Sequence, residues 1–497
     1  MDKSVIIIGA GIAGLSAGCY GQMTGYRTSI FEMQDKPGGV CTSWQRDGYT
    51  IDGGLEWVVG SAPGNEFYGI WEELGAALPE RRVVNYDELG RIEGDGGKAF
   101  VLYTDINRLE QHMKDLAPED NAAIRKFISA LRTCTRYEAS VEKAPELMGL
   151  IDRLKKVLRT IPFYSLTKWK KISTQDFADS FDNPFLREAF HNLGESPETP
   201  MIDLLMSLAW HHRKVAGYPV GGSLEFARSI ERRYLNLGGK VNYSSPVASI
   251  RVENDQANGV ILADGSEHSA DIVISAADGH ATIFDLLDGR YASEQVKEYY
   301  ERLPVSAASI QVALGVSQSF VGQPHSVTYF LDRPLIIAGQ EHRRVNLKVY
   351  NFDQTLTPEG KTVLKVTFPA DYEFWKALSE NPKRYKDEKE HVADRVVALL
   401  DQRFPGLKGK VDLRDVATPA TWEQYTGNWR GACQGWMATT RTMELRKSRT
   451  LPGLKNFYMA GQWVEARGGL PQAAVSGRNV MQVICKRDRK PFVPTIV

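Results

Sequence analysis

Cysteine is scarce in this sequence and shows no pairing pattern. The five cysteines are Cys19, Cys41, Cys134, Cys433 and Cys485, and they form no CxxC motif and no cluster with histidine. This spacing argues against a disulfide framework and against a metal site, and it is typical of a reducing cytoplasm. We therefore expect a cytoplasmic protein that holds no metal ion.

An excess of charge and long apolar runs are missing as well. Lys plus Arg and Asp plus Glu each number 61, so the net charge is zero, whereas nucleic-acid-binding proteins usually carry a basic excess. No apolar run reaches the roughly 20 residues that cross a bilayer. The first predicted strand begins at Ser4, which leaves no room for a signal peptide. We expect no nucleic-acid partner and no transmembrane segment.

The beginning of the chain carries a dinucleotide-binding motif. Val5–Ile8 is a β-branched apolar run, typical of a strand buried on both faces. Gly9, Gly11 and Gly14 follow it as GxGxxG. The first glycine permits a tight turn, the second lets the backbone approach a pyrophosphate, and the third lets the next helix pack on the strand. That helix, expected from Ala13, would point its first amides at the phosphates.

An acidic residue, Glu32, follows the motif at the distance that is typical of dinucleotide-binding sequences. Arg27–Phe31 predicts a second strand, and Glu32 follows it, 18 residues after Gly14. A carboxylate at this place binds ribose hydroxyls and disfavours the 2′-phosphate of NADP. Because strand, glycines, helix and acid occur together, the motif strongly indicates a bound dinucleotide.

Further glycines follow closely and indicate an extended cofactor. Gly38–Gly39 comes soon after Glu32, and Gly53–Gly54 ends the loop expected over residues 48–54. Both doublets would let backbone approach the cofactor. This arrangement resembles the FAD-binding half of flavin oxidoreductases of the amine oxidase and phytoene desaturase type.

Longer stretches make the resemblance more specific. They are GAGIAGLSAG (9–18), KPGGVCTSWQRDGYTIDGG (36–54), PVGGSLEFARSIERRYLNLGGKV (219–241), VISAADGHAT (273–282) and MAGQWVEARGGLPQAAVSGRNV (459–480). In content and order they resemble the phytoene desaturase, carotenoid isomerase and retinol saturase family of FAD-dependent oxidoreductases. The sequence departs from that pattern at Val40–Cys41, where an arginine often lies, and at Arg467, where a less charged residue is expected.

The resemblance implies an α/β fold with a Rossmann-like FAD-binding domain and an inserted mixed-sheet and helical substrate domain. The expected division is FAD-binding segments at 1–100, 216–290 and 450–497, a helical substrate- or membrane-facing region at 101–215, and a mixed-sheet substrate domain at 291–449. It also implies FAD contacts along all three FAD-binding segments. The expected contacts are Gly9, Gly11, Ile12, Ala13, Gly14, Glu32, Met33, Gly38, Gly39, Val40, Gly53, Gly54, Leu55, Val247, Ala276, Gly461, Gln462, Gly469, Leu470, Pro471 and Ala473.

By the same resemblance, the expected reaction is desaturation, saturation or cis–trans isomerisation of a hydrophobic polyene or isoprenoid-like substrate, by hydride exchange with flavin N5. The flavin carries this chemistry, and the protein positions the substrate and excludes water. Arg467, Glu465 and His211 are the candidate catalytic side chains. No second GxGxxG follows a strand, which argues against a dedicated nicotinamide domain.

Residues 147–171 combine apolar, aromatic and basic side chains. Leu and Ile alternate there with Arg153, Lys155, Lys156 and Arg159, and Phe163, Tyr164 and Trp169 stand near Lys168, Lys170 and Lys171. Such a segment can lie in a membrane interface, and it can equally be a surface helix with a solvated basic face. The protein is therefore expected to be cytoplasmic, with peripheral membrane contact as one option.

Two other functions stay open at this point. One is an amine oxidase-type flavoenzyme that acts on a soluble amine, which a lysine facing the flavin would support. The other is a non-enzymatic prenyl-lipid-binding protein of the Rab GDP-dissociation inhibitor type, which resembles this fold but uses no FAD. The complete glycine motif and Glu32 argue against the latter.

Overall fold

A parallel five-stranded sheet is assembled from distant parts of the chain in the computed structural model, which describes residues 2–77, 80–138, 141–445 and 447–494. Its strand order is β10–β2–β1–β14–β20, and every neighbouring pair is parallel. The strands are β1 (Ser4–Ile8), β2 (Arg27–Phe31), β10 (Lys240–Asn242), β14 (Ile272–Ser275) and β20 (Phe457–Met459). Apolar residues bury both faces of the central strands, as expected of a parallel sheet covered on each side.

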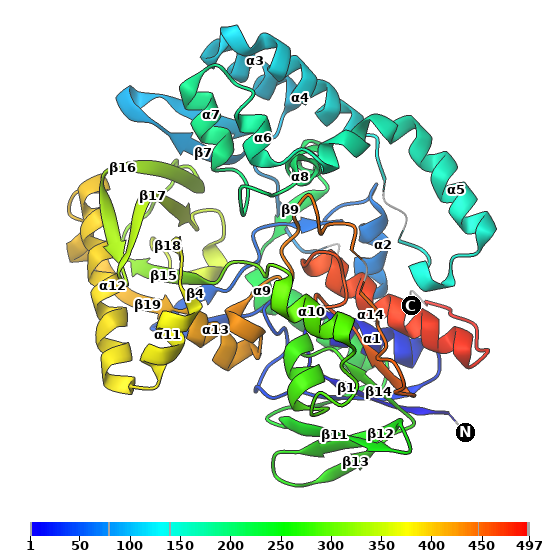
Figure 1. Cartoon of the computed structure of the whole chain (residues 1–497). Helices are drawn as coiled ribbons and strands as arrows, with labels where there is room; N and C mark the ends of the chain where they lie inside the picture. Colours follow the sequence, from blue (N-terminus) through cyan, green and yellow to red (C-terminus); the bar gives the residue numbers. More distant parts are fainter. Residues whose placement is uncertain (1, 78–79, 139–140, 446, 495–497) are drawn as a thin grey trace.

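Three helices cover one face of this sheet. They are α1 (Ile12–Met23), α9 (Gly222–Asn236) and α14 (Leu470–Arg487). Figure 1 shows α14, in red near the C-terminus, beside the blue α1 near the N-terminus. The two helices approach closely because Gly477 has no side chain: a Cβ there would lie 2.3 Å from Ala13 O. The first and last segments of the chain therefore form one unit.

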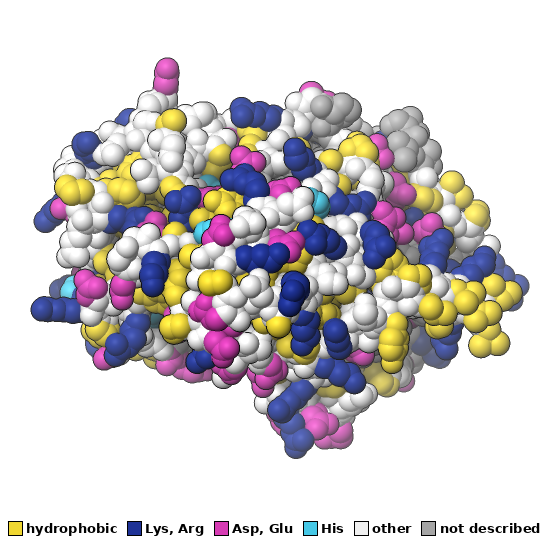
Figure 2. Space-filling view, turned by 90° about the horizontal axis from the view of Figure 1, so that it is seen from above, with side chains coloured by type: hydrophobic (Ala, Val, Ile, Leu, Met, Phe, Trp, Pro, Cys, Tyr) yellow, Lys and Arg dark blue, Asp and Glu magenta, His cyan; other side chains and the backbone are white. Residues whose placement is uncertain are grey.

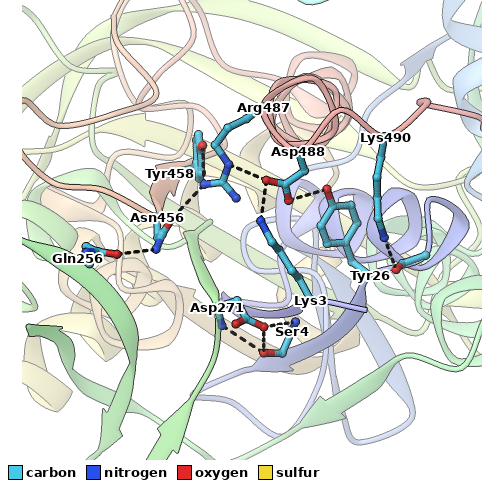
Figure 3. A network of polar contacts seen from close by, with 11 residues as sticks. Lys3, Ser4, Tyr26, Gln256, Asp271, Asn456, Tyr458, Arg487, Asp488 and Lys490 are labelled. Carbon is cyan, nitrogen blue, oxygen red and sulfur yellow. Dashed lines mark hydrogen bonds and ion pairs between the residues drawn. The ribbon is translucent and has the colours of Figure 1, made fainter. Parts of the chain in front are cut away.

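A polar network locks the two ends of the chain together, as Figure 3 shows. Asp488, just after α14, accepts hydrogen bonds from Lys3 Nζ at 2.8 Å and from Tyr26 Oη at 3.0 Å. Ser4 donates through its backbone N and its Oγ to Asp271 Oδ2, at 2.7 and 2.8 Å. These contacts hold the start of β1 against the start of β14 and the end of α14.

A second sheet has seven strands in the order β19–β15–β18–β17–β16–β7–β8. They are β7 (Glu88–Glu93), β8 (Ala99–Tyr103), β15 (Ser309–Val316), β16 (Ser326–Ile337), β17 (Gln340–Val349), β18 (Thr362–Pro369) and β19 (Val411–Ala417). One face is apolar and packs against α12 (Pro382–Arg403). The opposite face meets β4 (Tyr49–Asp52), where Tyr49 and Ile51 contact Ala313.

A helical layer lies above both sheets in Figure 1. Its main helices are α3 (Ile106–Leu116), α4 (Asn121–Cys134), α6 (Thr174–Ala178), α7 (Pro184–His191) and α8 (Met201–His212), which enclose a separate apolar core. The 3₁₀ segment η4 (Ile161–Lys170) packs on α4 and α8. The helix α5 (Leu150–Thr160) precedes η4 and projects from the right-hand edge of the view.

Shorter elements complete the fold. They are β3 (Ser43–Arg46), β5 (Val58–Val59), β6 (Val83–Val84), β9 (Ala216–Pro219), β11 (Val247–Glu253), β12 (Gln256–Leu262), β13 (Glu267–Ser269), α2 (Glu66–Glu73), α10 (Glu294–Arg302), α11 (Tyr372–Ser379) and α13 (Pro419–Thr426). The predicted α/β class, with a parallel-sheet core and a separate mixed sheet, is confirmed.

Two local features differ from the expectations. Residues 48–54 are expected as a loop, but Tyr49–Asp52 is a strand paired with Ser43–Arg46, because Tyr49 and Ile51 are buried against the second sheet. The strand β19, which forms an edge of that sheet, is not expected from the sequence. The expected domain boundaries stay a prediction, and residue 1 and residues 495–497 lie outside the described residues.

Candidate cofactor and substrate site

A large cavity opens at the carboxyl edge of the parallel sheet. Register places Ile8, Phe31, Ser275 and Met459 side by side at that edge. The cavity has a volume of about 380 Å³, which lies within the roughly 300–1,000 Å³ of ordinary small-molecule pockets. Ligands of open parallel sheets bind at this edge.

Most of the expected cofactor contacts lie on the wall of this cavity. They are Gly9, Gly11, Ile12, Ala13, Glu32, Met33, Gly38, Gly39, Val40, Gly53, Gly54, Leu55, Val247, Ala276, Gly461, Gln462, Gly469, Leu470 and Ala473. Gly14 and Pro471 are not on the wall. A Cβ on Gly14 would lie 1.9 Å from Gly9 O, so that glycine serves the packing of α1 on β1. Pro471 is buried in the first turn of α14.

The glycine turn leaves room for a ligand at the N-terminus of α1. Gly11 caps that helix with an ordinary φ of −67°. A Cβ placed on Gly11 would meet only Gly38 O, at 3.9 Å, so the space in front of it is open. Gly9 has a φ of +96°, which favours glycine. Free backbone amides and the helix dipole make this the position for a pyrophosphate.

Glu32 is held in place by backbone donors. Its Oε2 accepts from Ala10 N at 2.7 Å, and its Oε1 accepts from Gln34 N at 2.9 Å. Burial raises the pKa of this carboxyl, and the backbone hydrogen bonds oppose the rise. The carboxylate keeps lone pairs on the cavity wall that can accept from ribose hydroxyls.

Asp52 shapes the second glycine turn. This carboxylate is 2% exposed. Its Oδ1 accepts from the amides of Gly54 at 3.0 Å and Leu55 at 3.1 Å, and its Oδ2 accepts from Ser223 N at 2.6 Å. A Cβ on Gly54 would have no atom within 4 Å, so Gly54 presents bare backbone to the cavity. Asp52 therefore fixes the loop on the side away from the cavity, and the side that faces the cavity is open.

The opposite wall comes from the last segment of the chain. Gly461 N donates to Ser476 Oγ at 2.9 Å, which fixes the turn after β20. The amides at the start of α14 face the cavity through Leu470 and Ala473. Trp463 is 4% exposed and lies on the wall, and its Nε1 has no hydrogen-bond partner among the described residues. This nitrogen is itself buried, so the indole contributes its apolar surface to the wall.

Sequence reasoning missed one part of the wall, formed by residues 425–428 with Cys433 and Gln434. Asp278 joins this part to the sheet, since its Oδ2 accepts from Trp429 N at 3.0 Å and its Oδ1 from Ala281 N at 2.9 Å. Burial raises the pKa of Asp278 to about 6. The regular spacing of Gly427, Gly431 and Gly435, all with positive φ, was the signal that could have found this loop.

Two catalytic candidates are engaged in ion pairs. Arg467 Nη1 binds the carboxylate of Asp203 on α8. Glu465 accepts from Arg449 Nη2 at 2.6 Å, and Arg449 also binds Ser476 Oγ at 2.7 Å. Neither Arg467 nor Glu465 is among the residues that line the cavity. Their catalytic role stays a prediction, while the contacts show that both stabilise the segment between β20 and α14.

The third candidate, His211, is buried near the end of α8. Its Nδ1 lies 2.7 Å from Ser207 O, so Nδ1 carries the proton and donates. Its Nε2 has no partner among the described residues, and its ring packs at 5.0 Å from that of Trp57. Burial lowers the pKa of His211 to about 4. The imidazole is neutral at physiological pH, and its catalytic role stays a prediction.

The second sheet presents polar side chains to the glycine loop. Lys348 and Lys365 are paired residues of β17 and β18, so they share one face. Lys348 Nζ binds Glu56 Oε2 at 2.7 Å. Lys365 is 4% exposed, and its ammonium lies 5.3 Å from the ring centre of Tyr350. This face of the mixed sheet, which belongs to the expected substrate domain, therefore carries two lysines beside the cavity.

Metal-ligating side chains do not gather in the ranges that the structure describes. There, no group of three or more His, Cys, Asp and Glu side chains is placed to hold a metal ion. The described part of the chain also contains no helix that is both long and apolar enough to cross a membrane.

The arrangement meets the chemical needs of FAD at three points. An open anion cradle lies at Gly11, an anchored acid lies at Glu32, and bare backbone lies at Gly54. All three line one continuous cavity. The residues present therefore fit an extended dinucleotide cofactor.

Comparison with known proteins points the same way. The family described as flavin containing amine oxidoreductase matches residues 12–485. Prolycopene isomerase of Daucus carota is 27% identical over 437 residues, which cover 85% of this chain and 70% of that protein. A lycopene-forming phytoene desaturase of a Paracoccus strain is 23% identical, with 97% of each chain covered. An inactive all-trans-retinol 13,14-reductase of Danio rerio is 24% identical, with 94% of this chain and 83% of that protein covered.

Solved structures of similar fold include two amine oxidases. Wild-type putrescine oxidase bound to putrescine matches with a TM-score of 0.58 at 15% identity, over 98% of this chain and 100% of that one. Cyclohexylamine oxidase from Brevibacterium oxydans matches with a TM-score of 0.58 at 15% identity, over 99% and 100% of the two chains. Identities this low show a shared fold and nothing more about the substrate.

Proposed function

Because this chain belongs to the family of flavin containing amine oxidoreductases, we propose that it is an FAD-dependent enzyme that acts on the C=C or C–C bonds of a hydrophobic polyene or isoprenoid-like substrate. The reaction is desaturation, saturation or cis–trans isomerisation. The family and its flavoenzyme fold make FAD the cofactor and the protein an oxidoreductase. The observation that carries the substrate class is the match of 85% or more of the chain to proteins named for prolycopene, phytoene and retinol.

FAD, when bound, supplies reversible hydride transfer. The chain supplies binding and orientation. The amides at the start of α1 would neutralise phosphate charge, and Glu32 would accept from the ribose. The turn held by Asp52 brings the Gly54 backbone to the cavity. The amides at the start of α14 favour negative charge in front of them. Trp463 lies on the cavity wall, and Trp436 and Tyr300 pack against its ring.

One observation supports a second candidate function, the oxidation of a soluble amine. The buried ammonium of Lys365 acts electrostatically on Asp52 and on Cys433, both next to the cavity. A lysine near the flavin is the feature that would support an amine oxidase.

One assay separates the two candidates. FAD-loaded protein is incubated with prolycopene, phytoene or all-trans-retinol in detergent micelles, once in air and once without oxygen after reduction by dithionite, and in parallel with putrescine or cyclohexylamine in air. We expect chromatography to reveal a new polyene isomer or oxidation state and no peroxide from the amines. Turnover of an amine with all polyenes unchanged would replace the first candidate by the second.

A further inference from the structure

The helix α5 turns its apolar side away from the protein. Seven large apolar side chains of α5 and the start of η4 are exposed by more than half. They are Leu150 (85%), Ile151 (71%), Leu154 (60%), Val157 (56%), Leu158 (57%), Ile161 (59%) and Tyr164 (77%). On a helix their spacing of i, i+1, i+4, i+7, i+8 and i+11 from Leu150 to Ile161 forms one continuous stripe. Figure 2 shows apolar and basic side chains together on the projection at the right-hand edge, where Figure 1 places α5.

The neighbouring η4 segment, in contrast, buries two of its large apolar side chains. Its Leu166 and Trp169 are 6% and 1% exposed and pack into the helical layer. Lys126 and Lys168 lie 5.7 and 5.9 Å from the Trp169 ring centre. The base of the projection is therefore anchored, whereas α5 itself has no buried residue.

On the polar side of α5, Asp152 binds the segment that precedes the helix. Asp152 accepts from Lys143 Nζ at 2.6 Å and from Gly149 N at 3.0 Å. No residue of α5 is buried, and the helix has 11 residues. Isolated helices shorter than roughly 12–15 residues are marginal in water, so an exposed apolar stripe on α5 needs a further partner to be stable.

The charges beside the stripe identify that partner. Arg153 and Lys155 border it on either side, and Lys168 and Lys171 are exposed on the adjoining segment. Asp152, the acidic residue of α5, is already paired. An apolar stripe with basic borders matches an anionic lipid surface, where Leu and Tyr enter the acyl boundary and Lys and Arg meet phosphate groups.

A second copy of this chain fits less well. A two-fold contact would bring the same surface of both copies together, which would oppose Arg153 and Lys155 to their own equivalents. We propose that α5 and the start of η4 are an interfacial anchor that docks the protein on an anionic bilayer. The anchor joins the site through η4 and α8, because α8 carries Asp203, the partner of Arg467. The proposal does not depend on which reaction the enzyme performs.

Vesicle flotation of the FAD-loaded full chain tests this anchor. Vesicles of phosphatidylcholine alone are compared with vesicles that contain about one-third phosphatidylglycerol. We expect the protein to float with the anionic vesicles, and added salt to weaken this binding. The double variant Leu154→Ser/Leu158→Ser should bind at least about tenfold more weakly. Arg153→Gln should lose roughly fivefold, on anionic vesicles only.

Val321→Ser is the matched control, because Val321 is 82% exposed on a loop away from α5. It should float like the unchanged protein, and all variants should keep their flavin absorbance and melting temperature. The proposal is overturned if the unchanged protein stays with neither vesicle, or if the Leu154/Leu158 variant binds as well as the unchanged protein. It is also overturned if light scattering reveals a dimer that this variant abolishes, since the stripe would then bind a second copy.

Discussion

The carboxylate of Glu56 lies 2.7 Å from the ammonium of Lys348, and this ion pair joins the loop after Gly53–Gly54 to strand β17 of the second sheet. Burial opposes ionisation of Glu56, but Lys348 and Lys365 outweigh it and lower the pKa of this carboxyl. The contact therefore fixes the distance between the glycine loop and the sheet that faces it.

Lys348→Met should loosen this connection. Glu56 is 44% exposed, so solvent screening limits the expected loss of stability to about 1 kcal/mol. A carboxyl with a lowered pKa stabilises the fold above its unfolded pKa, and this contribution disappears as pH falls through the folded pKa. Urea unfolding should therefore separate the variant from the unchanged protein at pH 7 and not in acid. An equal difference at both pH values would contradict the assigned ion pair.

Gly11→Ala should remove the cofactor without removing the fold. The added methyl enters the open space before α1, where the nearest atom is Gly38 O at 3.9 Å, and φ at this residue is ordinary. We expect bound flavin to fall at least about tenfold, because the methyl occupies the phosphate position. The melting temperature of the cofactor-free protein should stay close to that of the unchanged protein.

Gly14→Ala is the contrasting variant. Its Cβ would lie 1.9 Å from Gly9 O, so α1 would have to move off β1. We expect loss of soluble folded protein, whatever FAD concentration is added. If Gly14→Ala folds normally while Gly11→Ala does not, the roles assigned to the two glycines are reversed.

Glu32 should make FAD binding sensitive to acid. Burial raises the pKa of this carboxyl, so its acceptor form is lost at a higher pH than that of an ordinary glutamate. FAD affinity should decline as pH falls through that raised pKa. Glu32→Gln should bind FAD more weakly at neutral pH and lose this pH dependence, as measured by fluorescence titration. A pH dependence that is unchanged in Glu32→Gln would assign it to another group.

His211 should destabilise the fold in acid. Burial lowers its pKa from the ordinary value of 6.5 to about 4. The neutral ring is therefore compatible with the fold, and stability present above pH 6.5 is lost as pH falls toward 4, by about 3 kcal/mol in all. His211→Phe should lose less stability than the unchanged protein between pH 7 and pH 4.5, measured by urea unfolding, and an equal loss would rule out burial as the cause.

Local sequence signals suffice to bring the glycine motif and its acid to one cavity. Gly9, Gly11 and Glu32 lie within one strand–helix–strand unit, so their spacing alone places them together. Residues 425–428 were missed because a tertiary contact between distant loops, Trp429 N to Asp278, brings them to the cavity. The catalytic candidates Glu465 and Arg467 were chosen by proximity in sequence, and their partners Arg449 and Asp203 could not be read from it.

The sequence also could not predict whether the apolar stripe of α5 faces the protein or the solvent. An amphipathic pattern gives the stripe from Leu150 to Ile161 but not the side on which the protein lies. Likewise, alternation in β17 and β18 does not tell which face meets the glycine loop. Packing of the apolar face against α12 decides it, and Lys348 and Lys365 then point to the site.

The most direct test of the central claim is anaerobic titration of the FAD-loaded protein with prolycopene and phytoene, once with oxidised flavin and once with flavin reduced by dithionite, followed by the visible flavin spectrum and by chromatography of the polyene. The account predicts one of three results: oxidised flavin is reduced as the polyene is desaturated, reduced flavin is reoxidised as the polyene is saturated, or the polyene changes geometry with no net change in the flavin. A purified chain that takes up no FAD would contradict it. Reduction of the flavin by an amine, with every polyene left unchanged, would also contradict the account.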